Sequence, residues 1–183
     1  MTILIVEGCD GAGKSTLLDK VAAHFGWASD FVMKLPRADM TAYWRRHPEE
    51  ATAEVVIKHV CAEMEKHCAK HPVAVFDRGW PSNFVYQENP VSFDDLPEFC
   101  RVTPTLIYLV QPSYAELVVR KAKRDGVGVG SGLADHLDTK TIHERYEKLR
   151  PSSPNHLVYR DDGPDVQRFI DMFNGMTKLE CAT

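Results

Sequence analysis

Short apolar segments rich in β-branched residues alternate along the chain with longer amphipathic segments. The apolar segments lie at residues 2–6, 31–35, 72–77, 106–110 and 156–159. Runs of this length, apolar at successive positions, are typical of strands buried on both faces of a parallel sheet. The second run is followed by Pro36, which ends a strand, and the third ends in an acid, Asp77. The pattern therefore predicts a central parallel sheet of about five strands.

The amphipathic segments between these strands predict helices. One helix is expected over about residues 14–25. The stretch 48–71 carries a single apolar stripe whose members recur every four residues, at Val56, Val60, Met64 and Cys68. Further helices are expected at about residues 113–124, at 138–149 and from Pro164 onward. Strands that alternate with helices favour a three-layer α/β/α fold, and because no long linker interrupts the pattern we expect one domain over residues 1–183.

The composition limits the partners of the chain. Of its 183 residues, 44% are hydrophobic and 26% are charged, which is ordinary for a globular domain with a buried core. The formal charge of −4 disfavours a nucleic-acid polymer as partner, so any phosphate must be met by local positive charge. No apolar run reaches the roughly 20 residues that span a bilayer, and we expect no membrane contact and no export signal. An odd number of scattered cysteines indicates reduced thiols in a cytoplasmic protein (Cys9, Cys61, Cys68, Cys100 and Cys181).

A glycine-rich loop, GCDGAGKS at residues 8–15, joins the first strand to the first helix. It matches the phosphate-binding pattern G-x-x-x-x-G-K-S/T at every specified position, and its strand-to-helix setting argues against a chance match. Glycines allow successive backbone N–H groups to face a phosphate at the positive end of a helix. We expect Lys14 to reach the β- and γ-phosphates of a nucleotide and Ser15 to offer its hydroxyl to Mg²⁺. Asp77, which ends a buried strand, fits the carboxylate that helps to hold Mg²⁺, although a lone acid there is more often a helix cap.

A reaction that joins two phosphates needs further positive charge, and the sequence supplies it in three places. Lys34 and Arg37 flank Pro36 after the second strand, and Arg78 directly follows Asp77. Four more cations crowd the segment before a glycine-rich stretch at residues 125–134, namely Arg120, Lys121, Lys123 and Arg124. The guanine-reading pattern N-K-x-D is absent from the chain. By contrast, Tyr114, Tyr146 and Tyr159 carry no interpretable signal.

Three motifs resemble those of thymidylate kinases. EGCDGAGKST at residues 7–16 is similar to that family's phosphate loop, E-G-x-D-G-A-G-K-S-T. DRGWPSNFVYQ at residues 77–87 resembles D-R-(Y/F)-x-x-S-x-x-A-Y-Q, and RKAKRDG at residues 120–126 resembles the R-x-x-x-R-G entry to the family's lid. The resemblance implies a P-loop kinase fold with a short lid over about residues 121–136. It also implies transfer of the γ-phosphoryl group from Mg·ATP to a deoxynucleoside monophosphate, and possible homodimer formation.

The resemblance also implies roles for individual residues. Asp10 would contact the sugar 3′-hydroxyl of the acceptor, Arg78 would hold the acceptor phosphate, and Tyr86 would pack under the sugar. Arg124 would stack on the adenine of ATP. The residues expected at the donor are Gly8, Asp10, Gly11, Ala12, Gly13, Lys14, Ser15, Thr16 and Arg124. Those expected at the acceptor are Asp10, Lys34, Arg37, Arg78, Ser82, Asn83, Tyr86 and Gln87. The catalytic cations would be Lys14, Arg78, Arg120 and Arg124.

The base of the acceptor stays open, because the sequence departs from the family where the base is held. The long helix offers Lys58 and His59 in place of the family's arginine and phenylalanine. Position 79 is Gly instead of an aromatic residue, and KLPRADM at residues 34–40 replaces R-E-P-G-G-T. Both dTMP and another monophosphate such as dAMP are consistent with a base pocket rebuilt from Trp44, His59, Trp80 or Phe84.

Two other functions remain alternatives. A deoxynucleoside kinase phosphorylates a neutral 5′-hydroxyl and benefits from a carboxylate base after the second strand. The sequence there is cationic, and its first carboxylate is Asp39. A non-catalytic nucleotide-binding switch would need the glycine loop alone, without Arg78 and the spacing of the second motif. The monophosphate kinase is therefore favoured.

Overall fold

The computed structural model describes residues 1–87, 89–125, 139–150 and 153–181. Within these residues five strands form one sheet in the order β2-β3-β1-β4-β5, and every neighbouring pair is parallel. The strands are β1 (Thr2–Glu7), β2 (Val32–Lys34), β3 (Val73–Asp77), β4 (Thr105–Val110) and β5 (His156–Asp161). The predicted five-stranded parallel sheet is confirmed, and each strand coincides with one of the apolar runs.

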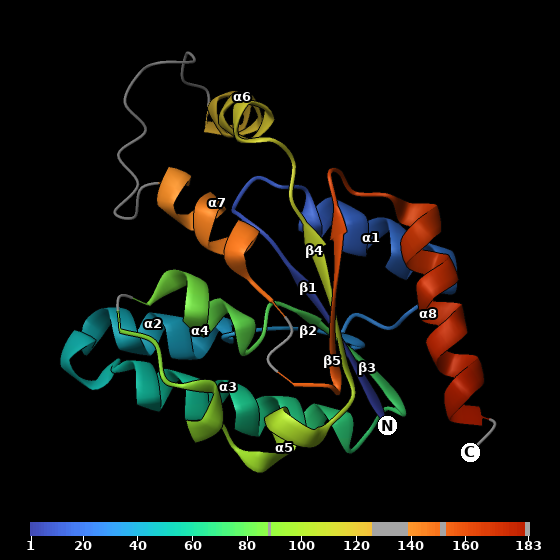
Figure 1. Cartoon of the computed structure of the whole chain (residues 1–183), viewed down its shortest axis with the longest axis horizontal. Coiled ribbons are helices and arrows are strands. Elements are labelled where there is room, and N and C mark those ends of the chain that lie inside the picture. The colour runs from blue at the N-terminus through green and yellow to red at the C-terminus, as the bar shows by residue number, and fades with distance from the viewer. Residues whose placement is uncertain (88, 126–138, 151–152, 182–183) are drawn as a thin grey trace.

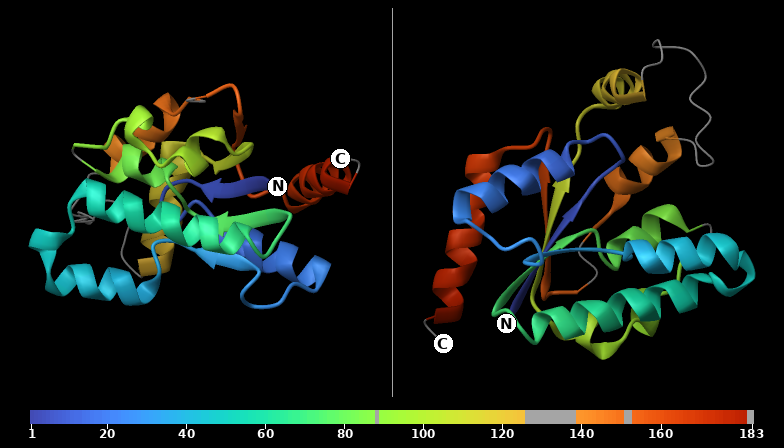
Figure 2. Two further views of the ribbon diagram at one scale, coloured as in Figure 1. Left: turned by 90° about the horizontal axis from the view of Figure 1, so that it is seen from below. Right: turned by 180° about the vertical axis from the view of Figure 1, so that it is seen from behind.

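Helices cover both faces of this sheet, as Figures 1 and 2 show. One face carries α1 (Lys14–Phe25) and α8 (Val166–Cys181), and the other carries α3 (Ala53–Cys68) and α5 (Glu98–Val102). Because side chains alternate along a strand, Leu4 and Val6 of β1 join the core with α1 and α8, whereas Ile3 and Ile5 join the core with α3. The protein therefore has the three-layer α/β/α fold of P-loop kinases.

The remaining helices lie toward the carboxyl ends of the strands. They are α2 (Ala38–Arg46), α4 (Pro81–Tyr86), α6 (Tyr114–Asp125) and α7 (Thr139–Lys148). In Figure 1, α6 lies beyond the ends of β4 and β5, and α7 lies beside it. Since all strands are parallel, the loops that follow β1, β3 and β4 meet at this edge, which is where α/β sheets bind ligands.

Several short elements were not expected from the apolar pattern. The stretch 48–71 is not one helix: a 3₁₀ turn (Pro48–Glu50) precedes α3, and the Thr52 hydroxyl caps α3 by accepting a hydrogen bond from Val55 N at 3.3 Å. The short helices α2, α4 and α5 and a 3₁₀ turn at Phe93–Asp95 are further differences. They are too short to develop an apolar stripe.

Two further expectations concern the lid and the membrane. Most of the expected lid, residues 126–136, lies outside the described residues. Among the helices that the structure describes, none combines the length and the apolar character needed to cross a bilayer.

Candidate functional site

The glycine loop folds as a phosphate-binding loop between β1 and α1. Gly8 has φ +141°, and a Cβ atom there would lie 2.2 Å from the carbonyl oxygen of Val110 in β4. Gly13 has φ +105°, and a Cβ atom there would meet Pro164 at 3.2 Å. Any other residue at these two positions would be strained, and its Cβ would overlap the end of β4 at position 8 and press on the turn after β5 at position 13. The loop is thus packed tightly against both neighbouring segments.

Lys14 closes this loop from the first turn of α1. Its side chain is buried, and Nζ donates hydrogen bonds to the carbonyl oxygens of Gly8 and Cys9, both at 2.9 Å. Burial, together with the nearby charge of Arg78, lowers the pKa of Lys14 to about 8. The ammonium group therefore lies within the loop, where a nucleotide phosphate would replace the backbone carbonyls as its partner.

Asp77 and Ser15 are the residues expected to hold Mg²⁺. Asp77 ends β3 next to Val6 of β1, so it lies beside the start of the loop. Its side chain is buried, and Oδ1 has no hydrogen-bond partner among the residues that the structure describes. Ser15 is exposed in the first turn of α1. A buried carboxylate oxygen without a partner and a serine hydroxyl in the first turn of α1 are hard oxygen donors, which fits Mg²⁺ with its water ligands.

Arg78 follows Asp77 in a strained conformation at the edge of the loop. Its φ is +72°, and its backbone N–H donates to Val6 O at 3.0 Å. The guanidinium forms an ion pair with Asp10 of the phosphate loop and lies 4.8 Å above the ring of Tyr86. The predicted acceptor residues Asp10, Arg78 and Tyr86 are therefore brought together in one cluster.

A buried carboxylate, Glu7, organises this cluster from the end of β1. The Gly79 N–H and the Ser82 hydroxyl donate to it at 3.0 Å, and the Tyr146 hydroxyl donates to Oε2 at 2.8 Å. Burial raises the pKa of Glu7, whereas the charge of Arg78, 3.8 Å away, acts in the opposite direction. Glu7 belongs to the first of the three motifs, but the sequence alone predicts no role for it.

Ser82, Asn83 and Gln87 lie on α4 or directly after it. Ser82 is bonded to Glu7, so in this structure it supports the cluster and does not face a base. Asn83 Nδ2 donates to Val91 O at 3.4 Å, while Asn83 Oδ1 and the Tyr86 hydroxyl are buried without a partner among the described residues. Their contacts with an acceptor stay predictions.

The two cations after β2 have different surroundings. Lys34 ends β2 in register with Asp77 and is exposed. Arg37 is paired with Asp39 at 3.3 Å and lies 3.7 Å from Glu63. Of these two candidates for the acceptor phosphate, Lys34 is the one that the strand register places next to the buried acid.

Helix α6 lies against the phosphate loop through two of its cations. Arg120 Nη1 donates to Ala12 O at 2.9 Å. Lys121 is buried, donates to the Thr139 hydroxyl at 2.9 Å, and its Cγ would lie 2.9 Å from a Cβ atom on Gly11. Arg124 lies near the end of the same helix, next to the undescribed residues. Arg120, at the entry to the expected lid, thus contacts the phosphate loop in this structure.

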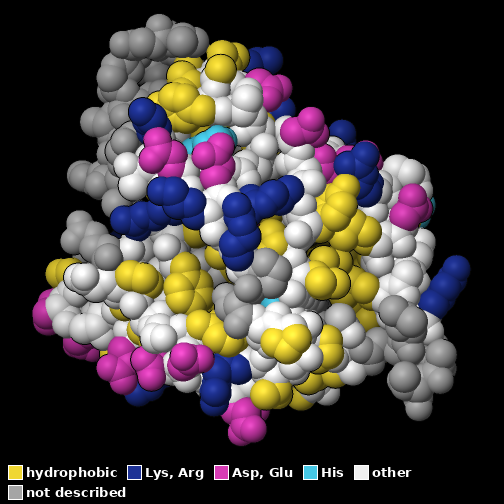
Figure 3. Space-filling view, in the orientation of Figure 1, with side chains coloured by type: hydrophobic (Ala, Val, Ile, Leu, Met, Phe, Trp, Pro, Cys, Tyr) yellow, Lys and Arg dark blue, Asp and Glu magenta, His cyan; other side chains and the backbone are white. Residues whose placement is uncertain are grey.

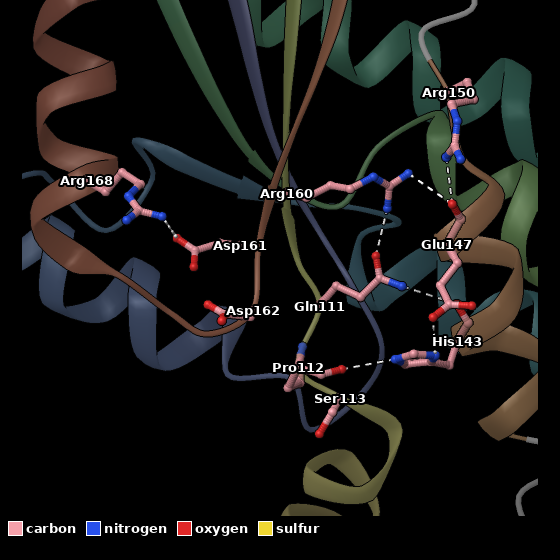
Figure 4. A pocket seen from close by; sticks show the side chains of 10 residues that line it. All are labelled: Gln111, Pro112, Ser113, His143, Glu147, Arg150, Arg160, Asp161, Asp162 and Arg168. Carbon is pink, nitrogen blue, oxygen red and sulfur yellow. Dashed lines mark hydrogen bonds and ion pairs between the residues drawn. The ribbon is translucent and has the colours of Figure 1, made fainter.

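A cavity of about 740 Å³ lies between helix α7 and the carboxyl ends of β4 and β5. Figure 4 shows its lining: Gln111, Pro112, Ser113, His143, Glu147, Arg150, Arg160, Asp161, Asp162 and Arg168. Gln111 follows Val110, which touches Gly8, and Asp162 lies two residues before Pro164, which touches Gly13. Two lining residues therefore lie within two positions of residues that pack against the phosphate loop. In Figure 3, Lys and Arg side chains with acidic neighbours gather on the face around α7 and the end of β5. No motif of the sequence predicts this cavity.

Known structures share this fold. The YorR protein of Bacillus subtilis, in complex with phosphorylated GDP, is 15% identical over 99% of this chain and 98% of its own, with a TM-score of 0.62. Thymidylate kinase from Ehrlichia chaffeensis is 13% identical over 94% of this chain and 98% of its own, with a TM-score of 0.58. Deoxyadenosine kinase from M. mycoides with bound dATP is 16% identical over 95% of this chain and 100% of its own, with a TM-score of 0.54.

Sequence comparisons add no closer relative: neither a protein-family model nor a curated protein matches the chain. At the identities of the solved structures, the likeness establishes the P-loop kinase fold.

Proposed function

We propose that this protein is an ATP-dependent deoxynucleoside monophosphate kinase. The observation that carries the proposal is the position of Arg78, a permanently charged and nearly buried side chain at the edge of the phosphate loop. An acceptor phosphate would compete with Asp10 for this guanidinium, which would free the Asp10 carboxylate to accept a hydrogen bond from the acceptor sugar. Tyr86 supports Arg78 from below and offers a flat surface to that sugar.

The donor would lie on the phosphate loop, with Lys14 and Arg120 at its phosphates. Its nucleoside would extend into the cavity at the ends of β4 and β5, which is lined in part by residues close in sequence to the neighbours of the loop. Ser15 and Asp77 would hold Mg²⁺, which when bound neutralises charge between the β- and γ-phosphates.

The reaction itself needs little covalent chemistry from the protein. An oxygen of the ionised acceptor phosphate forms a bond to the γ-phosphorus, the bond from that phosphorus to the β–γ bridging oxygen breaks, and ADP leaves. Because the acceptor is already an anion, no general base is required. The protein instead has to align two polyanions and reduce their repulsion, for which Lys14 and Arg78 supply positive charge next to the loop.

For the acceptor, we propose dTMP or another deoxynucleoside monophosphate such as dAMP. Trp44 of α2 and His59 of α3 pack edge to face with ring centroids 5.5 Å apart. His59 Nε2 is buried and has no hydrogen-bond partner among the described residues. In this proposal that nitrogen would form a hydrogen bond with the base, in place of the phenylalanine contact of the thymidylate kinase motif.

A deoxynucleoside kinase is the second candidate, supported by the likeness in fold to deoxyadenosine kinase. That reaction benefits from a carboxylate base at the acceptor hydroxyl. Asp39, the first carboxylate after β2, is 65% exposed and paired with Arg37, while Asp10 is paired with Arg78. Both carboxylates are thus occupied by cations, which favours the phosphorylated acceptor.

The experiment that tests the proposal measures ADP release from Mg·ATP with each common ribo- and deoxyribonucleoside monophosphate, and with thymidine and deoxyadenosine in parallel. We expect turnover with one deoxynucleoside monophosphate to exceed the others clearly, which also identifies the base. Turnover of the nucleosides alone would replace the proposal with the second candidate. Slow hydrolysis that no acceptor stimulates would indicate a nucleotide-binding switch.

A further inference from the structure

Helix α7 touches the acceptor cluster with some of its residues and the cavity with others. Tyr146 and Arg145 contact β1, Arg78 and the end of α4, whereas His143 and Glu147 line the cavity. The helix has ten residues, so both sets of contacts lie within three turns. A displacement of α7 at the cavity would therefore also move its contacts with the cluster around Arg78.

On the acceptor side, the Tyr146 hydroxyl bridges two charged groups. It donates to Glu7 Oε2 at 2.8 Å and accepts a hydrogen bond from Arg78 Nη1 at 3.1 Å. Tyr146 is fully buried, so no solvent competes for this bridge. Because Arg78 is held in a left-handed backbone conformation that arginine rarely adopts, its orientation depends on such surrounding contacts.

Arg145, the preceding residue of α7, holds the end of α4. Its Nη1 donates to the carbonyl oxygens of Val85 at 2.8 Å and Gln87 at 2.9 Å. These carbonyls flank Tyr86, whose ring lies beneath the Arg78 guanidinium. Helix α7 thus fixes the acceptor arginine twice, through a hydroxyl and through the ring that supports it.

On the cavity side, α7 is tied to the ends of β4 and β5. His143 Nε2 donates to Pro112 O at 3.0 Å. Arg160 of β5 donates to Tyr146 O at 3.0 Å and to Gln111 Oε1 at 2.7 Å, and it also donates to Leu149 O. Figure 4 shows Arg160 extending from β5 toward Gln111 and α7. The carbonyls at the end of α7 are therefore held by a residue that lines the cavity.

We propose that Tyr146 is a positioning residue for phosphoryl transfer, through which α7 couples occupation of the cavity by the donor nucleoside to the orientation of Arg78. The inference rests on the proposed function, in which Arg78 binds the acceptor phosphate. Donor and acceptor should then bind cooperatively, and the factor should be the same whichever ligand binds first. Removal of the Tyr146 hydroxyl should reduce the factor by which each ligand tightens binding of the other, while helix α7 itself stays in place.

The test compares the wild type with Tyr146→Phe by steady-state kinetics and by binding of the preferred monophosphate with and without a non-hydrolysable ATP analogue. We expect Tyr146→Phe to lower kcat about ten-fold or more, because a hydrogen bond to a charged group is lost. The acceptor KM should rise several-fold, while the affinity for the ATP analogue alone changes less than two-fold. The analogue should tighten acceptor binding at least five-fold in the wild type and hardly at all in the variant.

Tyr108→Phe is the matched control, because Tyr108 is also fully buried and its hydroxyl donates to a carboxylate, Asp161. It should lower Tm by a similar amount and, because Tyr108 contacts neither Glu7 nor Arg78, leave the acceptor KM unchanged. If Tyr146→Phe does not fold, a second variant is Arg145→Gln, which removes only the hydrogen bonds to the end of α4. It should also weaken the cooperativity between donor and acceptor.

Two results overturn the inference in distinguishable ways. A wild type that shows no monophosphate-dependent ADP release contradicts the proposed function, and the inference with it. An active wild type beside a Tyr146→Phe variant with unchanged kcat and unchanged cooperativity contradicts the role of Tyr146 alone.

Discussion

The guanidinium of Arg78 forms an ion pair with the carboxylate of Asp10, a residue of the phosphate loop 68 positions earlier in the chain. The pair joins the loop that would hold the donor to the residue that would hold the acceptor. Neither partner is placed there by its neighbours in sequence alone, because β1 and β3 must first lie side by side. The pair therefore marks the point at which the two phosphates would meet.

Arg78→Ala should lower kcat/KM for the acceptor by about 10²–10³-fold, since one cation at the transferring phosphoryl group is lost. Binding of a non-hydrolysable ATP analogue should change by less than about three-fold, because Lys14 and the loop backbone remain. Steady-state kinetics and calorimetry on the same preparation check both values. Equal losses in the two measurements would contradict the acceptor role of Arg78.

Lys14 should make nucleotide binding depend on pH above neutrality. With a pKa of about 8, its ammonium is about half deprotonated at pH 8 in the free protein, and a bound phosphate favours the charged form. Binding of an ATP analogue should therefore take up about half a proton at pH 8, and affinity should fall up to ten-fold for each pH unit above it. Calorimetry in two buffers with different ionisation enthalpies measures the uptake.

Lys14→Met supplies the control for this proton uptake. It should bind the analogue weakly, with proton uptake at pH 8 close to zero. An undiminished uptake in Lys14→Met would assign the titration to another group.

Gly8→Ala should destabilise the fold by about 2 kcal/mol or more, because it adds both backbone strain at φ +141° and an overlap with Val110 O. Gly26→Ala isolates the first cost: its φ is +64°, no atom of the described residues lies within 4 Å of a Cβ there, and we expect a loss of about 1 kcal/mol. Gly175→Ala, within α8 and likewise without a described neighbour at its Cβ, should instead stabilise by about 0.5–1 kcal/mol. Urea unfolding of the three variants measures the change in the free energy of unfolding for each and so gives their order. Equal effects of Gly8→Ala and Gly26→Ala would show that the contact with β4 carries no cost.

The sequence predicts the elements whose ends carry local signals. Helix α1 begins at Lys14 and ends at Phe25, as expected, because Gly13 and Gly26 both adopt the left-handed conformation at its boundaries. The strands were also found, since each contains a short run of mostly apolar residues. Helices α2 and α4 were not predicted, because nine and six residues are too few for a recognisable apolar stripe.

The candidate site divides in the same way. The phosphate loop and Arg78 lie within contiguous motifs, so their residue types and spacing are visible in the chain. Tyr146 looked no different from Tyr114 or Tyr159, because its role comes from contacts with Glu7 and Arg78 that only the folded chain creates. The cavity is likewise built from four separate elements, none of which carries a motif for it.

A substitution of Asp77 tests directly whether this residue holds Mg²⁺. Its Oδ1 is buried without a hydrogen-bond partner among the described residues, so an Asn at this position keeps the shape and removes the charge that Mg²⁺ requires. Asp77→Asn should raise the Mg²⁺ concentration for half-maximal turnover about ten-fold or more, with little change in Tm. Asp171→Asn, exposed on α8, is the charge-matched control and should leave the Mg²⁺ dependence unchanged. If both variants follow the wild-type Mg²⁺ curve, Asp77 does not hold the metal, and its buried carboxylate would have to act on Lys14, whose charge it favours.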